Sequence, residues 1–192
     1  LQCTVLLFAN LLLMAALVWG SPTDDGGSLV LFKLASMIGV VWWLLAMLWL
    51  RHIGFASDHD THARVFKPAA GTLAVVPAWC ALGWLHWEDP LGPRWTLFAL
   101  ALVWAADSGA YFAGSKFGKR KLAPSISPGK TWEGALGGAL GVLLFGFGIL
   151  VAFGARQPGG AFAIALALLA WTAISVIGDL FESLLKRQAG LK

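Results

Sequence analysis

The sequence predicts an all-α fold, a polytopic transmembrane helical bundle with about six membrane spans. Of the 192 residues, 58% are hydrophobic and only 12% are charged, and the mean hydropathy is +0.75. Soluble domains carry about 25% charged residues, so water is not the main solvent of this chain. A helix needs about 20 mostly apolar residues to cross a bilayer, which makes apolar runs of that length the first feature to locate.

Six such runs occur, separated by polar segments. They cover residues 3–20, 29–50, 69–86, 95–113, 134–154 and 161–178. The first run lacks the basic n-region and the cleavage site of a secretory signal, so we expect it to be a membrane helix. The runs predict a single integral membrane domain over residues 1–192.

The basic residues are distributed unevenly between the predicted loops. Eleven of the 14 Lys and Arg residues follow the second run, follow the fourth run or lie in the tail: Arg51, Arg64, Lys67, Lys116, Lys119, Arg120, Lys121, Lys130, Lys186, Arg187 and Lys192. Cytoplasmic loops are enriched in Lys and Arg, so we expect these three segments to be cytoplasmic. The net charge of +4 then reflects membrane orientation and not nucleic-acid binding.

Three carboxylates lie within or just after a predicted span. Asp107 is in the cytoplasmic half of the fourth run, Asp179 ends the sixth, and Glu182 follows on the same face if the helix continues. Ionisable groups at such positions are costly and usually functional. Clustered carboxylates suit Mg²⁺, which binds through one or two carboxylates plus substrate phosphates. The alternative is that they form ion pairs with Lys186 or Arg187.

The segment 114–133 is predicted to be a cytoplasmic, phosphate-binding basic loop. It combines five cations with glycines and hydroxyl groups immediately before a helix. We expect Ser127 to cap that helix, Pro128 to lie in its first turn, and the N–H groups of Gly129 to Thr131 to face an anion. Lys130 would add a positive charge. The glycine spacing excludes a Walker A motif. The alternative is a loop that binds lipid head groups or only sets orientation.

Two further patterns have structural explanations. The segment 51–67, with His52, His59 and His62 beside Asp58 and Asp60, matches no zinc-site spacing and predicts a solvated loop. Glycines recur at spacings of three and four in the fifth run, which indicates close approach of another helix. These are Gly134, Gly137, Gly138 and Gly141.

The polar segments resemble a known family. Residues 107–114 (DSGAYFAG), 117–119 (FGK) and 122–134 (LAPSISPGKTWEG) closely resemble the central motif of bacterial phosphatidate cytidylyltransferases, also called CDP-diacylglycerol synthases. Residues 178–187 (GDLFESLLKR) resemble the opening of that family's C-terminal signature. The rest of that signature is not present here, so we expect the chain to be truncated at both ends and to carry only part of the catalytic centre.

The resemblance implies transfer of the cytidylyl group of CTP to phosphatidic acid, with release of pyrophosphate and Mg²⁺ as cofactor. It implies an active site on the cytoplasmic face of a bacterial inner membrane. We expect Asp179 and then Asp107 to be metal ligands, with Glu182 as a third catalytic candidate. The residues expected to bind CTP or the lipid phosphate are Lys119, Ser127, Gly129, Lys130 and Thr131. Lys186 and Arg187 are expected to neutralise the phosphatidate head group.

Other functions remain open at this point. A secondary transporter would show broken helices or inverted repeats, and neither is evident. A CTP-dependent polyprenol kinase or another lipid enzyme could share a basic nucleotide loop. A non-catalytic lipid-binding protein would yield no CTP-dependent product. Membrane lipids are expected partners, nucleic acid is not, and the sequence leaves a monomer or a homodimer open.

Overall fold

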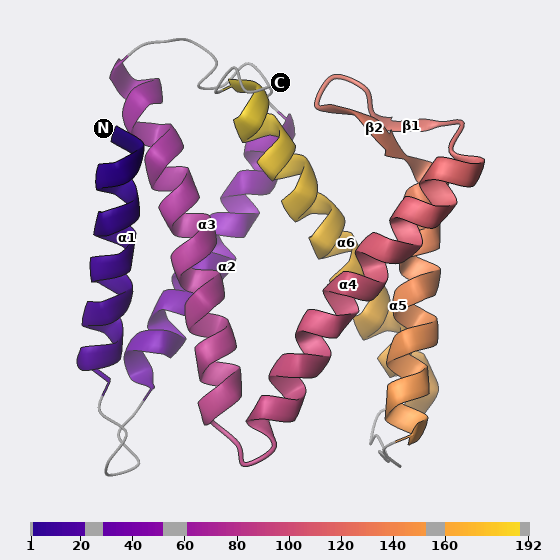
Figure 1. Ribbon diagram of the computed structural model, residues 1–192, viewed down its shortest axis with the longest axis horizontal. Coiled ribbons are helices and arrows are strands. Elements are labelled where there is room, and N and C mark those ends of the chain that lie inside the picture. Colours follow the sequence, from indigo (N-terminus) through magenta and orange to yellow (C-terminus); the bar gives the residue numbers. More distant parts are fainter. Residues whose placement is uncertain (1, 22–28, 52–60, 153–159, 189–192) are drawn as a thin grey trace. The chain divides into compact units, whose positions relative to one another are not determined.

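The computed structural model describes residues 2–21, 29–51, 61–152 and 160–188, with side chains from residue 4 and, in the third helix, from residue 67. These residues form six helices and one antiparallel two-stranded hairpin (Figure 1). The elements are α1 (Gln2–Trp19), α2 (Val30–Arg51), α3 (Thr61–Trp87), α4 (Gly92–Phe117), β1 (Lys121–Ala123), β2 (Ser127–Thr131), α5 (Trp132–Ala152) and α6 (Gly160–Gln188). The predicted all-α class is therefore confirmed, with the hairpin as an addition.

The helices have the length and surface of membrane spans. Five are long and apolar enough to cross a bilayer, while α1 has a shorter apolar stretch, Thr4–Trp19. Within the five spans only 11% to 22% of the most apolar window is buried inside the protein. Large side chains such as Leu48, Leu97 and Leu144 are exposed. Lipid must cover this apolar surface, so the chain is an integral membrane protein.

The helices and the predicted runs differ mainly at their ends. Helix α3 begins at Thr61, before the predicted start at 69, and α6 continues past 178 to Gln188. The segment 114–133, expected to be a loop, contains the end of α4, the hairpin and the start of α5. Polar residues extend these helices because intrahelical hydrogen bonds continue where hydropathy falls, so hydropathy alone places the helix ends too early or too late.

The chain divides into two compact units, residues 1–96 and 97–192, each of which has its own core. In the first unit, α3 contacts both α1 and α2. Its core contains Phe32, Val76 and Cys80, which are buried together. A Cβ atom at Gly39 of α2 would lie 2.5 Å from the Cβ atom of Pro77, so the glycine allows α2 to approach α3 at the proline.

A polar cluster joins the ends of α2 and α3 in the first unit. Lys33 Nζ donates to Glu88 Oε1 at 2.7 Å, and Trp84 Nε1 donates to the other carboxylate oxygen at 2.8 Å. The Lys33 ammonium also lies 5.2 Å from the centre of the Trp84 ring. The hydrogen bond from Lys33, assisted by that from Trp84, lowers the pKa of Glu88 against a smaller opposing effect of desolvation.

In the second unit, α4 and α5 approach each other through small residues. A Cβ atom at Gly109 would lie 2.5 Å from the carbonyl oxygen of Gly137, and one at Gly138 would lie 2.9 Å from that of Ala106. The predicted role of the α5 glycines in close helix packing is confirmed. Farther along the same helices, Leu102, Val142 and Leu168 form a core that also includes α6. The backbones of α4 and α5 are thereby held in contact beside the hairpin.

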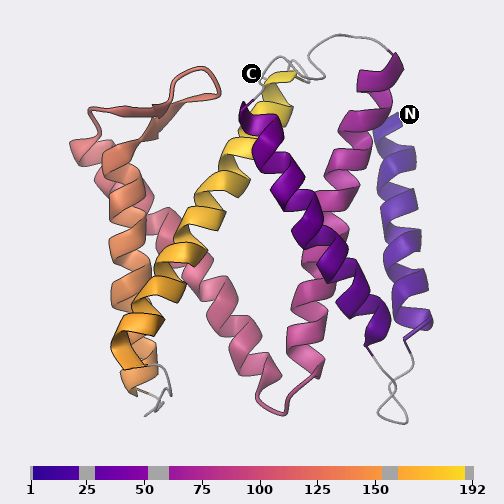
Figure 2. The same cartoon turned by 180° about the vertical axis from the view of Figure 1, so that it is seen from behind.

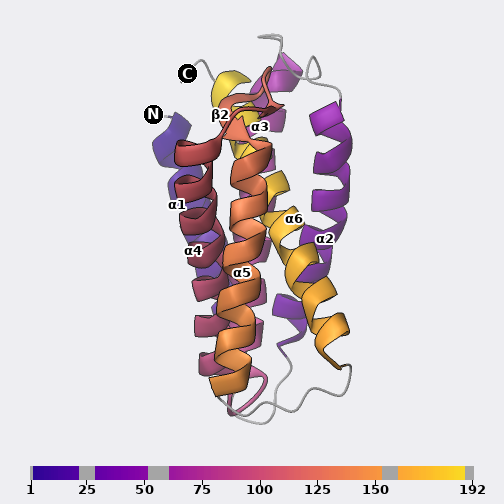
Figure 3. The ribbon, with the colours of Figure 1, turned by 90° about the vertical axis from the view of Figure 1, so that its right-hand side faces the viewer.

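The hairpin lies at one end of the second unit. Figures 1 and 3 show it directly beyond the C-terminal end of α4 and the N-terminal end of α5. Figure 2 shows the C-terminal end of α6 at the same end of this unit. Strand β2 contacts both α5 and α6. This end therefore brings together the polar segments that the sequence singled out.

Candidate active site

The end of the hairpin that joins α5 is held by the N-cap of that helix. Thr131 is the last residue of β2, and its hydroxyl accepts a hydrogen bond from the backbone N–H of Gly134 at 3.1 Å. Thr131 is therefore the N-cap of α5, and the prediction that Ser127 caps this helix and Pro128 lies in its first turn is wrong. The residue before a proline is disfavoured in helical conformation, and Ser127 instead pairs with Ala123 in the strand ladder.

Residues 127–131 consequently form a strand and not the anion-facing start of a helix. Ser127 and Gly129 stay candidates for substrate binding, but by position on β2 and not by helix N–H groups. A Cβ atom at Gly129 would meet nothing within 4 Å, so the strand is open at this residue. Thr131 is buried and engaged in the cap, which gives it a structural role whatever it binds.

Glu133 closes the base of the hairpin from the other side. Its carboxylate accepts hydrogen bonds from the backbone N–H groups of Lys119, at 3.1 Å, and Arg120, at 3.2 Å. The backbone N–H of Trp132 also donates to the carbonyl oxygen of Arg120 at 2.9 Å. The first turn of α5 thus fixes the backbone that carries two of the basic side chains.

The central contact of the site is an ion pair between the hairpin and α6. Lys130 Nζ of β2 lies against Asp179 Oδ2 of α6, and the Lys130 side chain is 27% exposed. Asp107 of α4 lies close enough to interact electrostatically with both residues. Three residues that the sequence predicted as site residues, from three separate elements, therefore form one cluster.

The remaining predicted residues lie along the last turns of α6. Glu182 forms an exposed ion pair with Lys186 one turn later. The alternative interpretation of the carboxylates, pairing with a nearby cation, thus applies to Glu182 and also to Asp179, which pairs with Lys130. Arg187 Nε donates to the carbonyl oxygen of Ile126, whose side chain is buried in the hairpin turn. Figure 1 shows the turn of the hairpin directed toward this end of α6.

The donor set bears on the expected metal. Among the described residues there is no group of three or more His, Cys, Asp or Glu side chains that could hold an ion. Asp107 and Asp179 supply two carboxylates, which fits a Mg²⁺ ion completed by substrate phosphates and water. His52, His59, Asp58 and Asp60 lie outside the described residues, as does the side chain of His62.

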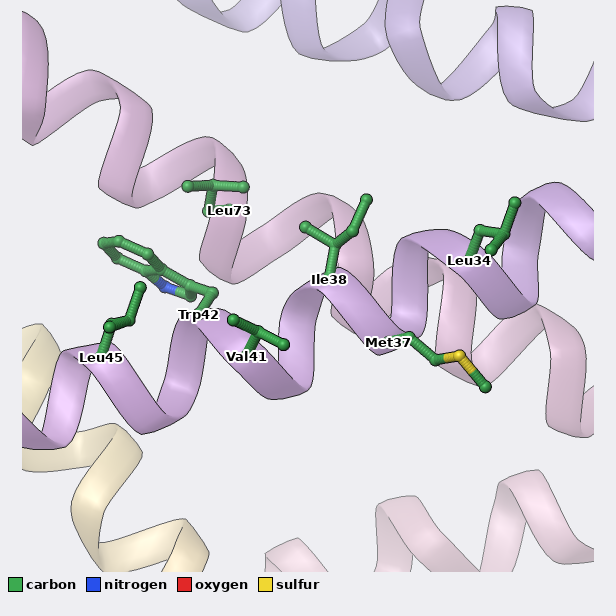
Figure 4. A pocket seen from close by; sticks show the side chains of 7 residues that line it. All are labelled: Leu34, Met37, Ile38, Val41, Trp42, Leu45 and Leu73. Carbon is green, nitrogen blue, oxygen red and sulfur yellow. The ribbon is translucent and has the colours of Figure 1, made fainter.

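A concave surface in the first unit has different chemistry. It lies between α2 and α3, and six of its seven lining residues belong to α2. Figure 4 shows their side chains. All seven side chains are hydrocarbon-rich, and none is ionisable, so this hollow suits lipid chains and not a nucleotide. Its lining residues are Leu34, Met37, Ile38, Val41, Trp42, Leu45 and Leu73.

Three features of the site were missed at the sequence level: the hairpin, the role of Glu133, and the tie between Arg187 and Ile126. The hairpin could have been recognised from Pro124-Ser125, a turn-forming pair between two short segments. Glu133 could have been recognised as an acidic residue in the first turn after a Thr cap. The tie between Arg187 and Ile126 has no local sequence signal, because the two residues are 61 positions apart.

Comparison with known proteins agrees with these observations. Over 102 residues the chain is 50% identical to the phosphatidate cytidylyltransferase of Haemophilus influenzae, covering 50% of this chain and 34% of that protein. It is 39% identical to the enzyme of that name from Pseudomonas aeruginosa over 163 residues, which are 81% of this chain and 56% of the relative. The Brucella suis relative of the same name is 44% identical over 125 residues, which are 65% of this chain and 45% of the relative.

The chain thus spans from about a third to just over half the length of these relatives. No solved structure matches it. The model of the Cytidylyltransferase family matches residues 2–192, which is nearly the whole chain. This polytopic membrane protein, with its acidic and basic cluster at one end of the second unit, therefore belongs to the cytidylyltransferase family.

Proposed function

We propose that the protein transfers the cytidylyl group of CTP to phosphatidic acid, giving CDP-diacylglycerol and pyrophosphate. We also infer that the reaction takes place at the cytoplasmic face of a bacterial inner membrane. The observation that carries this proposal is the cluster of Asp107, Asp179 and Lys130, at the end of membrane helices and under a basic hairpin. The relatives named phosphatidate cytidylyltransferase support the substrates.

The position of the cluster suits a reaction between a lipid and a water-soluble nucleotide. Helices α4, α5 and α6 are membrane spans, so acyl chains can stay in the bilayer beside them. Lys116, Lys119, Arg120 and Lys121 are exposed at the end where the hairpin lies. Phosphates of either substrate would be attracted to this group of cations, which lies at the level of the interface.

The chemistry requires positioning and neutralisation of charge more than a reactive side chain. A phosphate oxygen of phosphatidic acid forms a bond to the α-phosphorus of CTP. The bond from that phosphorus to the oxygen bridging the β-phosphate breaks, and pyrophosphate leaves with the electron pair. Negative charge develops on the leaving oxygen, where fixed cations stabilise the transition state. Lys130 and Lys119 are the residues that we assign to this task.

Mg²⁺ is the cofactor that fits this donor set, with Asp179 and Asp107 as its protein ligands. When bound, the ion would supply charge neutralisation for the triphosphate. Glu133 would hold the backbone of Lys119 and Arg120 in place, because its carboxylate takes both N–H groups. Glu182, Lys186 and Arg187 stay candidates for contact with the phosphatidate head group, with Arg187 also tying down the hairpin.

The proposal is tested with the protein expressed from its complete coding sequence and purified in detergent. Radiolabelled CTP, phosphatidic acid and Mg²⁺ are supplied, and labelled CDP-diacylglycerol is measured for wild type, Asp179→Asn and the control Glu88→Gln, which removes a carboxylate from the first unit. We expect Asp179→Asn to lower the rate at least about a hundredfold, or about 2.7 kcal/mol of transition-state stabilisation. The control should retain wild-type activity.

The outcomes separate the function from the site. No labelled product from folded wild-type protein would contradict the proposed reaction. Full activity in Asp179→Asn would retain the reaction and reject the metal site. A lipid product labelled from γ-labelled CTP with polyprenol, and none from cytidine-labelled CTP with phosphatidic acid, would transfer the assignment to a polyprenol kinase. A homodimer stays a prediction, which light scattering on the purified protein would test.

A further inference from the structure

Lys130 occupies the place on Asp179 that the expected cation would need. Its ammonium lies against Oδ2, with the carboxylate side chain 48% exposed on its other sides. Asp107 lies near enough to interact electrostatically with both Lys130 and Asp179. Two cations held on one carboxylate repel each other, so an ammonium group at Oδ2 disfavours a Mg²⁺ ion on the same carboxylate.

The charges explain why some cation must be present. Asp107 and Asp179 carry two negative charges at the end of apolar helices, where repulsion is less screened than in bulk water. Lys130 reduces the total to one negative charge. With Mg²⁺ added the three side chains and the ion would total one positive charge, which complements the phosphates of a nucleotide.

The backbone that carries Lys130 is fixed independently of this ion pair. Arg187 holds the hairpin turn at the carbonyl of Ile126, Thr131 caps α5, and Glu133 holds the other end of the hairpin. The Lys130 side chain itself is partly exposed, at 27%. The long, flexible lysine stem can therefore change partner while the strand stays in place.

We propose that Lys130 is a built-in substitute cation, which neutralises Asp179 until a divalent ion arrives and then moves from Asp179 to a phosphate oxygen of the nucleotide. This inference deepens the proposed function and rests on it for the nature of the nucleotide. In this exchange a cation lies beside Asp179 in both states, Lys130 before the metal arrives and the metal afterwards. It also makes the lysine available to the triphosphate only when the metal is bound.

The first test measures Mn²⁺ binding to the purified protein by electron paramagnetic resonance, with neither CTP nor lipid present. Removing the competing ammonium in Lys130→Met should tighten Mn²⁺ binding about tenfold. Lys130→Arg, which keeps the charge, should bind Mn²⁺ as weakly as wild type, and Asp179→Asn should bind it more weakly still. Unchanged or weaker binding by Lys130→Met would overturn the proposal, as would absence of Mn²⁺ binding in every variant.

The second test follows the lysine itself. Amine acylation by a water-soluble ester, read by mass spectrometry, should modify Lys130 at least about threefold faster after Mg²⁺ is added, because the ammonium leaves its carboxylate partner. Lys121, on the paired strand, is the internal control and should not change. Equal rates at Lys130 with and without Mg²⁺ would overturn the exchange. Both tests omit phosphatidic acid, so their result is independent of whether CDP-diacylglycerol is formed.

Discussion

Arg187 Nε donates a hydrogen bond to the backbone carbonyl of Ile126, and so ties the last turn of α6 to the turn of the hairpin. Ile126 as a whole is only 6% exposed, which makes this an apolar as well as a polar attachment. The hairpin that carries Lys130 is therefore attached to the helix that carries Asp179 at a second point. An arginine expected only to meet a lipid head group also organises the site.

Loss of this tie should loosen the hairpin. A hydrogen bond from a charged donor contributes about 1.5 to 3 kcal/mol, so Arg187→Gln should speed amide hydrogen exchange in residues 121–131 about tenfold or more. The control is Lys186→Gln, which removes the neighbouring charge but leaves the tie. If both variants exchange like wild type while both raise KM for phosphatidic acid, Arg187 acts only on the lipid.

Glu133 should stabilise the base of the hairpin, because its carboxylate accepts hydrogen bonds from two backbone N–H groups. Replacing it by Ala leaves the N–H groups of Lys119 and Arg120 without this partner, which should destabilise the hairpin. The midpoint of thermal unfolding in detergent should fall, and the KM for CTP should change. Glu133→Gln should be intermediate, because an amide oxygen can still accept a hydrogen bond. The exposed Glu182→Gln is the matched control for stability and should unfold like wild type. A stability of Glu133→Ala equal to that of the control would contradict this role.

Two glycines of α5 should respond oppositely to alanine. A Cβ atom at Gly141 would lie 2.7 Å from the carbonyl oxygen of Ala105 in α4, whereas one at Gly148 would meet nothing within 4 Å. Gly141→Ala should therefore lower the free energy of unfolding by about 1 to 3 kcal/mol, and Gly148→Ala should leave it unchanged or raise it. Unfolding followed as a function of the concentration of a denaturing detergent measures the free energy of unfolding of both variants. Equal stabilities would show that α4 and α5 separate without cost.

Glu88 should make the first unit sensitive to acid. Its pKa in the folded protein is lowered by the hydrogen bonds from Lys33 and Trp84, so it stabilises the fold when ionised. The contribution is present in full above the ordinary glutamate pKa of about 4.3, declines as the pH falls below that value, and is lost below the lowered folded-state pKa. The difference in thermal midpoint between wild type and Glu88→Gln should follow this course when tryptophan fluorescence is recorded from pH 7 to pH 3. A difference that is constant over this range would exclude Glu88 as its source.

Much of the architecture could be predicted from local sequence. The apolar runs coincide with the six helices to within a few residues at most ends, because partition into a bilayer depends on hydropathy summed over contiguous residues. The glycine spacing in α5 predicted close packing, since the absence of side chains is visible in the sequence. The partner helix, α4, was not predictable from that spacing.

The start of α5 shows where local reasoning failed. Ser127-Pro128 has the composition of a helix start, yet the helix begins at Trp132 after the Thr131 cap. Ser127 and Pro128 are compatible with a helix start and with a strand. The pairing of Ser127 with Ala123 across the hairpin selects the strand.

By itself the sequence determined the membrane-spanning helices, the basic segments and the family, because hydropathy, charge and motif are properties of adjacent residues. Only the tertiary structure decided that Lys130 meets Asp179, 49 residues away, and that Arg187 holds the hairpin turn. Such contacts depend on which elements pack together and at what depth. The local sequence does not specify these contacts, because many cations and carboxylates far apart in the chain could pair equally well.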